Sequence, residues 1–371
     1  MAQTFDVCIR GAGIVGRTLA LLLARERLRV ALVAAPQATD AERDVRAYAL
    51  NTGSKQLLES LRAWPDPLHA TALRHMEVFG DEGGCVHFDA GAQAVDALGW
   101  IVDVPALENR LSEAVRYQPL VEVVSSPVDA PLTAICEGRA SSTRSEFGVE
   151  FDTTPYPQHA LATRLTCERP HSQVARQWFS DDGILAFLPL EGPEGHSVAV
   201  VWSTAPAQAQ QWKEAEPEAF ANKLQELSHY ALGSLALQGP RLSWPLQQAV
   251  AQRWCGQRPD GNGHWVLAGD AAHNVHPLAG QGLNLGLADV QALARILQTR
   301  GWRSTGDVKL LRQYERERKA GLAPMGLAMD GLQQLFSRPE APLQALRNWG
   351  MLAFERSGPL KDWMARQAMG L

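Results

Sequence analysis

Residues 5–35 read FDVCIRGAGIVGRTLALLLARERLRVALVAA, and this stretch decides the fold. An apolar run with the composition of a β-strand comes first, a glycine-rich turn follows it, and a stretch with helical spacing then leads to the second apolar run VALVA. This order predicts a strand–helix–strand unit. Such units build parallel sheets, so the sequence predicts an α/β fold with a Rossmann-like domain.

The turn inside this unit, GAGIVG, fits the G-x-G-x-x-G fingerprint with Gly11, Gly13 and Gly16. Glycines at these positions permit a tight turn, a close approach of the backbone to a pyrophosphate, and close packing of helix on strand. Because the motif lies in a complete unit, it predicts a dinucleotide site, with a turn that merely packs as the alternative. The acidic residue that usually binds an adenosine ribose is missing, since the second strand ends in Ala34 and Ala35.

Composition narrows the possible partners and the location of the protein. The chain has 371 residues, of which 46% are hydrophobic and 20% charged, so it can bury a large core in two domains or one elaborated domain. The net charge is -5 and no basic stripe is present, which argues against nucleic-acid binding.

The five cysteines form no CxxC pair, which argues against a zinc site or disulfides and favours a reducing compartment. Charged residues interrupt the first apolar stretch, so it resembles no signal peptide or membrane span, and we expect a cytoplasmic protein.

Apolar spacing predicts further elements along the chain. Helices are predicted for SKQLLESLRAW, for residues 217–232 and for most of the sequence after Leu283. LGWIVDVPALENRLSEAV predicts a strand followed by a helix, and WVLAGD predicts another strand. Residues 118–160 have only weak periodicity. A second, largely antiparallel sheet is predicted from HMEVFGD, GCVHFDA, HALATRL, GILAFLPL and SVAVVWS.

A second glycine-rich segment, LAGDAAHNVHPLAGQGLNLGLADV, covers residues 267–290. The predicted strand before it delivers Asp270, whose carboxylate could accept hydrogen bonds from a polyol. Backbone amides where the next helix begins, near Leu283, suit an electron-rich ring that becomes anionic on reduction. A metal at His273 and His276 would need further ligands, and none lies at suitable spacing, so we interpret them as histidines that position the loop.

Together, GAGIVG and GDAAHNVHPLAGQGLNLGLAD resemble the FAD-dependent aromatic hydroxylases, the single-component class A monooxygenases. The resemblance is strongest to the ubiquinone-biosynthesis hydroxylases and covers nearly the whole chain. It also includes RAYALN at 46–51, MEVFGDEGGCVHFDA at 76–90, LGWIVDVPALENRL at 98–111 and LLRQYERERK at 310–319.

The resemblance implies FAD as cofactor and assigns residues to it. The pyrophosphate would lie against Gly11, Ala12, Gly13 and Gly16, with Arg46 beside it, and Asp270 would bind the ribitol side. Glu108 lies roughly where the family often places a glutamine near FAD. The isoalloxazine ring would be lined by Pro277, Gly280, Gln281, Gly282, Leu283 and Asn284. No catalytic base is identified.

The resemblance also implies an activity: hydroxylation of a polyprenylated phenol in ubiquinone biosynthesis, with NAD(P)H and O2. A single nucleotide fingerprint means that NAD(P)H would bind transiently, without a Rossmann domain of its own. Possible contacts are other quinone-biosynthesis proteins and the inner-membrane surface, the latter through a basic amphipathic C-terminal region, although packing against the FAD domain is the alternative for that region. The implied domains are FAD-binding (1–72, 97–148 and 259–320), substrate-binding (73–96 and 149–258) and C-terminal helical (321–371).

The sequence departs from the family pattern at three places. Ala34 is the first, and the second is Glu137, which with Gly138 replaces the family's Asp-Gly pair. The third is the stretch between Leu111 and Glu137, which is shorter than the family pattern. These departures leave open a non-catalytic relative that serves as a scaffold in quinone biosynthesis, and a hydroxylase of a small soluble aromatic is a further alternative.

Overall fold

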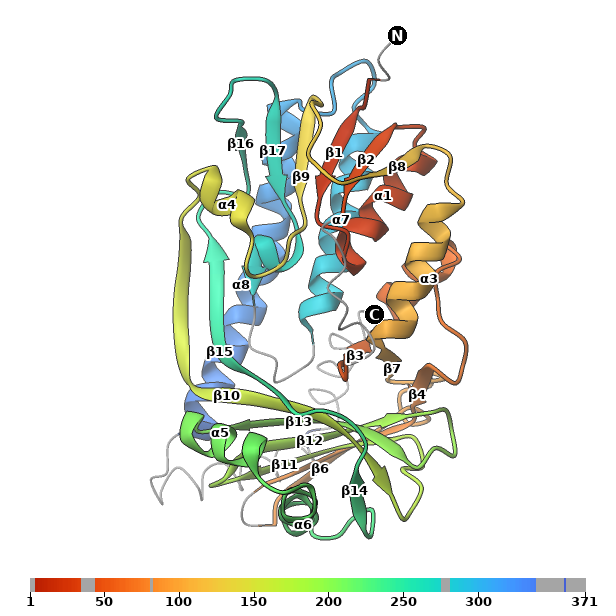
Figure 1. Ribbon diagram of the computed structural model, residues 1–371, viewed down its shortest axis with the longest axis vertical. Helices are drawn as coiled ribbons and strands as arrows, with labels where there is room; N and C mark the ends of the chain where they lie inside the picture. Colours follow the sequence, from red (N-terminus) through yellow and green to blue (C-terminus); the bar gives the residue numbers. More distant parts are fainter. Residues whose placement is uncertain (1–3, 35–43, 81–82, 275–280, 338–356, 358–371) are drawn as a thin grey trace.

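The computed structural model describes residues 4–34, 44–80, 83–274 and 281–337, together with Ser357. Its strands form a six-stranded sheet at the top of Figure 1, a nine-stranded sheet at the bottom, and a three-stranded sheet beside the latter. This mixed α/β architecture confirms the predicted fold class. No helix of the described part is both long enough and apolar enough to cross a membrane.

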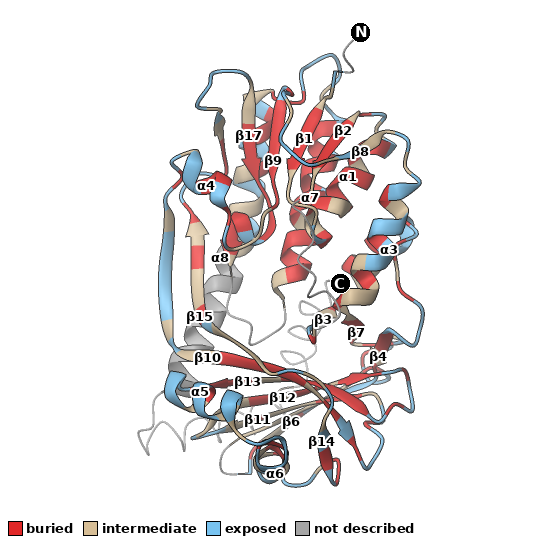
Figure 2. Cartoon of the chain, viewed as in Figure 1, coloured by how far each residue is buried: buried red, intermediate tan, exposed pale blue. Residues whose placement is uncertain are grey.

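The six-stranded sheet has the order β16-β17-β9-β1-β2-β8. Neighbouring strands run parallel except β16, which is antiparallel to β17. Its inner strands are almost wholly buried (Figure 2). The strands are β1 (Val7–Arg10), β2 (Val30–Val33), β8 (Val121–Val124), β9 (Leu132–Ile135), β16 (Cys255–Gln257) and β17 (His264–Leu267).

The predicted strand–helix–strand unit is confirmed as β1, α1 (Ile14–Arg25) and β2. From β1 the chain passes to β2 on one side, whereas β9 and β17 lie on the other side. The order of strands therefore reverses between β1 and β9. In open α/β sheets, ligands bind outside the carboxyl ends of the strands at such a switch point.

The nine-stranded sheet has the order β18-β15-β10-β13-β12-β11-β5-β6, with β14 paired to β10. It is antiparallel except for the pair β5 and β11, which confirms the predicted second sheet. Helices α5 (Pro206–Glu214) and α6 (Pro217–Leu227) cover one face, where Phe220 joins a buried aromatic cluster. The strands are β5 (His75–Phe79), β6 (Cys85–Asp89), β10 (Phe151–Cys167), β11 (Val174–Ser180), β12 (Gly183–Leu190), β13 (Ser197–Thr204), β14 (Leu235–Leu237), β15 (Leu242–Ala251) and β18 (His273–Asn274).

The three-stranded sheet, in the order β3-β7-β4, lies between the two larger sheets. It packs on the opposite face of the nine-stranded sheet through a small cluster that includes Leu73, Ile101 and Ala199. Its strands and the remaining helices are β3 (Ala47–Leu50), β4 (Ala70–Leu73), β7 (Gly99–Asp103), α2 (Thr52–Ser60), α3 (Val104–Arg116), α4 (Ser142–Glu146), the short 3₁₀ helix η2 (Gly269–Ala271), α7 (Gly282–Gln298) and α8 (Val308–Ser337).

Several elements differ from the prediction. Helix α2 ends at Ser60, before the predicted end, because Arg62 takes a left-handed conformation that turns the chain inward at buried Ala63. The predicted helix 217–232 ends at Leu227. Residues 118–160, with their weak periodicity, contain β8, β9 and α4, and α5, β11 and β15 were not predicted.

The division into domains stays a prediction. Strand β16 falls within the range 149–258 predicted for the substrate domain, yet it pairs in the six-stranded sheet. The predicted C-terminal region, 321–371, begins inside α8, and most of it lies outside the described residues.

Candidate cofactor site

Three loops meet at the carboxyl ends of β1, β9 and β17. Because these strands are adjacent and parallel, the residues that follow them reach the same edge of the sheet. The Cys136 amide donates to Arg10 O at 2.7 Å, and the Ala268 amide donates to Ile135 O at 3.1 Å. The structure thus brings the turn at Gly11 and the turn at Asp270 together, although they are far apart in sequence.

The glycines of the first loop, which follows β1, have different surroundings. Gly11 has a φ of +106°, and a Cβ there would lie 2.5 Å from Cys136 O. A Cβ at Gly16 would overlap Gly11 O, so this glycine lets α1 approach β1. Gly13 is the N-cap of α1, no side chain caps it, and a Cβ there would meet nothing within 4 Å. Open space in front of uncapped helix amides fits a pyrophosphate.

Asp270 follows β17 on η2, where Gly269 has a φ of +66°. Solvent reaches Asp270, but protein atoms surround it on most sides. The resulting desolvation raises the pKa of its carboxyl above the usual value, although the charges of His273 and Arg139 oppose the shift. It accepts no hydrogen bond from the described residues. A Cβ on Gly282 would lie 4.0 Å from Asp270 Oδ1, so this carboxylate stands beside the start of α7. An unpartnered carboxylate here fits a ligand rich in hydroxyls.

Arg46 lies just before β3. Its guanidinium makes a two-pronged ion pair with Asp44, with Nε–Oδ1 at 2.8 Å and Nη2–Oδ2 at 2.6 Å, and this hydrogen bonding raises its pKa. The charge of Glu108 contributes to that rise. It also opposes the lowering of the pKa of Arg17 that desolvation causes. The structure therefore places Glu108 near both arginines. The charge of Arg46 opposes the rise in the pKa of Asp270, so the two side chains lie in one region.

The start of α7 carries the predicted ring-lining residues that the structure describes, from Gln281 to Asn284. The Asn284 side chain is buried and fully used: Oδ1 accepts from Asn51 N and Ser54 Oγ at 3.0 and 2.7 Å, and Nδ2 donates to Ala49 O at 2.9 Å. Nδ2 also donates to Gln281 Oε1. This side chain therefore ties α7 to β3 and α2, so only its backbone is left to face a ligand. Pro277, Gly280 and His276 lie outside the described residues.

Asp289, which the sequence did not single out, fixes the loop that follows β17. It is fully buried on α7, and its carboxylate accepts from Gly269 N at 2.9 Å, His273 Nε2 at 2.6 Å and Arg318 Nε at 2.7 Å. Burial alone would raise its pKa, but the charges and hydrogen bonds of His273 and Arg318 lower it overall. The signal in the sequence was one acidic residue inside an otherwise apolar helix face.

His273 positions this loop. Its ring donates to Asp289 and stacks on Trp254, with the ring centroids 5.0 Å apart and an interplanar angle of 20°. Both rings are buried. No group of three or more His, Cys, Asp or Glu side chains arranged for a metal occurs in the part of the chain that the structure describes.

Glu137, the departure from the family's Asp-Gly pair, serves the middle loop. Its carboxylate accepts from Ser141 Oγ at 2.7 Å and from Thr143 N at 3.0 Å, at the start of α4, and it pairs with Arg10. Burial opposes ionisation, but these hydrogen bonds lower its pKa overall. Arg144 of α4 then donates to Ala271 O at 3.1 Å. Glu137 thus fixes the start of α4 to the loop after β9, and α4 in turn connects that loop to the turn at Asp270 through Arg144.

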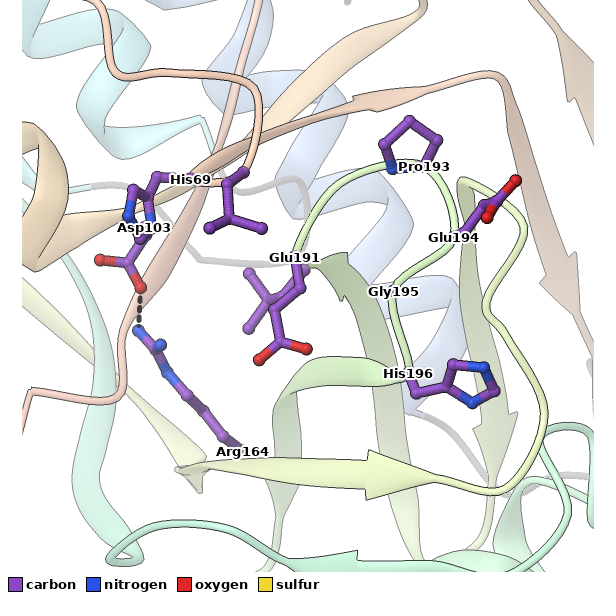
Figure 3. Close-up of a pocket in the computed structure, with 10 residues that line it drawn as sticks. His69, Asp103, Arg164, Glu191, Pro193, Glu194, Gly195 and His196 are labelled. Atoms are coloured by element: carbon purple, nitrogen blue, oxygen red, sulfur yellow. Dashed lines mark ion pairs between the residues drawn. The ribbon is translucent and has the colours of Figure 1, made fainter.

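A cavity of about 750 Å³ opens elsewhere, between the three-stranded sheet and the turn from β12 to β13 (Figure 3). Arg164 and Asp103 form an ion pair at its wall, at 2.6 Å, and Glu191 and His69 also line it. None of its lining residues belongs to the three loops. Charged and apolar side chains line it together, and its Arg164–Asp103 pair joins β10 to β7.

We expect Asp270→Asn to stabilise the cofactor-free protein and to weaken FAD binding. A carboxyl with a raised pKa favours the folded state only while protonated, so the ionised form costs stability as pH rises through the folded pKa. Asparagine removes this cost at neutral pH but loses a charged acceptor, which corresponds to about a 10-fold loss of affinity. Thermal melting at pH 7 and FAD titration measure the two effects.

The control is Asp181→Asn, at an exposed position before β12. It should change neither quantity. A variant Asp270→Asn that bound FAD as tightly as the wild type would remove this carboxylate from the site. The stability difference between Asp270→Asn and the wild type should shrink at low pH, since both side chains are then neutral.

Comparison with known proteins agrees with this geometry. Residues 113–324 match the family model described as an FAD binding domain. The 3-demethoxyubiquinol 3-hydroxylase of Escherichia coli is 29% identical and is aligned over 100% of this chain and 99% of its own. The ubiquinone hydroxylase UbiL of Rhodospirillum rubrum is 31% identical over 98% and 89% of the two chains. Human COQ6, a ubiquinone biosynthesis monooxygenase, is 28% identical over 96% and 91%.

Solved structures share the fold. PqsL, a probable FAD-dependent monooxygenase from Pseudomonas aeruginosa, has a TM-score of 0.73 and 22% identity, covering 94% of this chain and 100% of its own. The p-nitrophenol 4-monooxygenase PnpA from Pseudomonas putida has a TM-score of 0.76 and 18% identity, covering 100% and 97%.

Proposed function

The chain belongs to the family of FAD-dependent aromatic hydroxylases, in the group of the ubiquinone-biosynthesis hydroxylases, and from this membership we propose that it hydroxylates the ring of a polyprenylated phenol with NAD(P)H and O2. The observation that carries the proposal is the meeting of three loops, after β1, β9 and β17, around an open space at the start of α1. That space fits the pyrophosphate of FAD. The relatives' names supply the substrate class.

The residues around the space have distinct tasks in this proposal. The uncapped amides after Gly13 hold the pyrophosphate, and Asp270 accepts hydrogen bonds from the ribitol hydroxyls. The first amides of α7, from Gly282 on, face the flavin ring and stabilise negative charge there. Bound FAD supplies the transfer of electrons from NAD(P)H to O2. Asn284 and Asp289 keep α7 and the turn at Asp270 in place.

The nine-stranded sheet supplies an apolar wall for the substrate. The face without helices carries Ala162, Val201 and Ala186 in one row across neighbouring strands, and the row continues through β11 to Val78 of β5. Several of these side chains are only half-buried among the described residues. An apolar face turned toward the three-stranded sheet and α7 suits an aromatic ring with an aliphatic chain.

A polyprenylated substrate resides in a membrane, so the enzyme would meet it at the membrane surface. Peripheral contact at the inner membrane from the cytoplasmic side, and contact with other quinone-biosynthesis proteins, belong to this proposal. The basic C-terminal segment considered for that contact lies mostly outside the described residues.

Two measurements test the proposed function. The purified protein should show a flavin absorption spectrum, alone or after addition of FAD. With NAD(P)H, it should convert prenylated phenols to hydroxylated products, identified by mass spectrometry. A protein that binds FAD but hydroxylates only small soluble phenols would redirect the proposal to those substrates, and one that binds no FAD would favour the scaffold.

We expect Ala34→Glu to tighten FAD binding about 10-fold. Ala34 directly follows β2, where the family pattern places an acidic residue for the adenosine ribose, and its amide donates to Val124 O at 3.0 Å. A carboxylate there adds charge-assisted hydrogen bonds that alanine cannot make. FAD titration of Ala34→Glu against the neutral isostere Ala34→Gln measures the gain. Equal affinities for the two variants would place the ribose elsewhere.

A further inference from the structure

Gln177 is a polar side chain in the apolar row described above. On β11 it lies opposite Ala186 of β12 and Val78 of β5, and Ala186 in turn lies opposite Val201 of β13. Cross-strand partners share a face, so Gln177 belongs to this row. Its neighbours in the row are apolar.

The direction of this face follows from the alternation of side chains along β11. Ala175, two residues before Gln177, packs against Ile101 of the three-stranded sheet. Trp178 points the other way, into the cluster with Phe187 and Phe220 beneath α6. Gln177 therefore points to the side of the three-stranded sheet, whose strand β3 contacts α7. This is the side on which the cofactor loops lie (Figure 1).

The amide of Gln177 is half-buried and makes no hydrogen bond with the described residues. A half-buried amide that makes no hydrogen bond to the protein can exchange its water partners for those of a ligand. Gln248 of β15, by comparison, accepts from Tyr156 Oη at 2.9 Å.

We propose that Gln177 is a specificity-determining residue that binds the ring hydroxyl of the phenolic substrate, while the surrounding apolar row contacts the ring and its aliphatic chain. This inference rests on the proposed function. The amide oxygen accepts the phenol O–H, and the amide N–H₂ donates to a neighbouring oxygen substituent of the ring. Such a contact orients the ring against the sheet and selects phenols over their deoxy analogues.

The test compares two probes, a short-chain 2-prenylphenol and the matched prenylbenzene that lacks the hydroxyl. Binding of each to the FAD-loaded protein is followed by the change in flavin absorption, and hydroxylated product is measured separately. The wild type should prefer the phenol. Gln177→Leu should reduce this preference about 5- to 10-fold, through weaker phenol binding, and should leave prenylbenzene binding unchanged or stronger.

Gln211→Leu is the matched control, because Gln211 is exposed on α5, beyond the opposite face of the sheet. It should retain the wild-type preference. Gln177→Glu keeps the length and one acceptor oxygen, so it should retain more of the phenol preference than Gln177→Leu. Thermal melting checks that each variant is folded.

The outcomes separate the two proposals. A wild type that hydroxylates prenylated phenols while Gln177→Leu keeps the full preference would overturn the role of Gln177 and leave the proposed function intact. Equal weakening for both probes would also overturn it, since that result indicates a general packing effect. A wild type that binds and hydroxylates neither probe would overturn both.

Discussion

Gly13→Ala should abolish most FAD binding while leaving the fold intact, whereas Gly16→Ala should destabilise the fold itself. The two glycines lie three residues apart in one motif, but their surroundings differ. A Cβ on Gly13 meets nothing within 4 Å, and the backbone there has an ordinary φ of -77°. A Cβ on Gly16 would overlap the carbonyl oxygen of Gly11, which is backbone and cannot move aside cheaply.

For Gly13→Ala, the new methyl group would occupy the space that the pyrophosphate needs. We expect FAD affinity to fall about 10- to 100-fold, the range for overpacking a close contact. The free energy of unfolding should change by less than about 1 kcal/mol, because alanine is a poorer N-cap but restricts the unfolded chain. For Gly16→Ala, the free energy of unfolding should fall by about 3 kcal/mol.

Denaturant unfolding of the cofactor-free variants and FAD titration distinguish these effects. Wild-type FAD affinity in Gly13→Ala would show that the space at the start of α1 is not the pyrophosphate site. Equal loss of stability in both variants would show that the motif serves packing alone, which is the alternative for such a turn.

Asp289→Asn should lower the free energy of unfolding by about 3–5 kcal/mol, the typical cost of removing one partner from a buried ion pair. The carboxylate is completely buried and accepts from a backbone amide, a histidine and an arginine. Asparagine leaves Arg318 without its counter-charge and presents an N–H₂ group to donors. Because asparagine has one acceptor oxygen in place of two, the network that fixes Gly269 is weakened, and purified Asp289→Asn should also retain less FAD.

The pH dependence has a definite sign. The pKa of Asp289 is lowered in the folded protein, so its contribution to stability is present above the unfolded value, about 3.9, and is lost as pH falls through the folded pKa. The wild type and Asp289→Asn should therefore converge in stability at acidic pH.

Glu317→Gln is the control for this charge change. Glu317 pairs with Arg295 on the surface, and such pairs contribute at most about 1 kcal/mol. A loss of only that size in Asp289→Asn would contradict a structural role for the buried network.

Local patterns predicted the parts of the site that local chemistry fixes. The glycine turn, α1 and the turn at Asp270 were predicted because each is encoded within a few residues, by glycine spacing and by the change from strand to helix periodicity. The same holds for β7 and α3, where Asp103 caps the helix by accepting from Ala106 N at 2.9 Å.

Other features depend on contacts between distant segments, which no single window of sequence contains. Strand β9 lies at the switch point, yet its four residues are too short for a clear period, and only its neighbours β1 and β17 give it a place. Asp289 and Arg318 are separated by 29 residues, so their bond follows from how α7 and α8 pack. Glu137 departs from the family motif in sequence, and only the folded structure shows that its carboxylate accepts a hydrogen bond from Thr143 N at the start of α4.

Asp289 also couples the conformation of the turn at Asp270 to the packing of α8 on α7. It accepts from Gly269, in the turn beside the proposed FAD site, and from Arg318, on α8. A ligand that favours this arrangement of the turn also favours the docked α8, and by thermodynamic reciprocity a docked α8 favours the ligand. Cofactor occupancy and protection of α8 from proteolysis are then two measures of one coupling free energy, so the protein free of FAD would be the form most readily cleaved at its C-terminal helix.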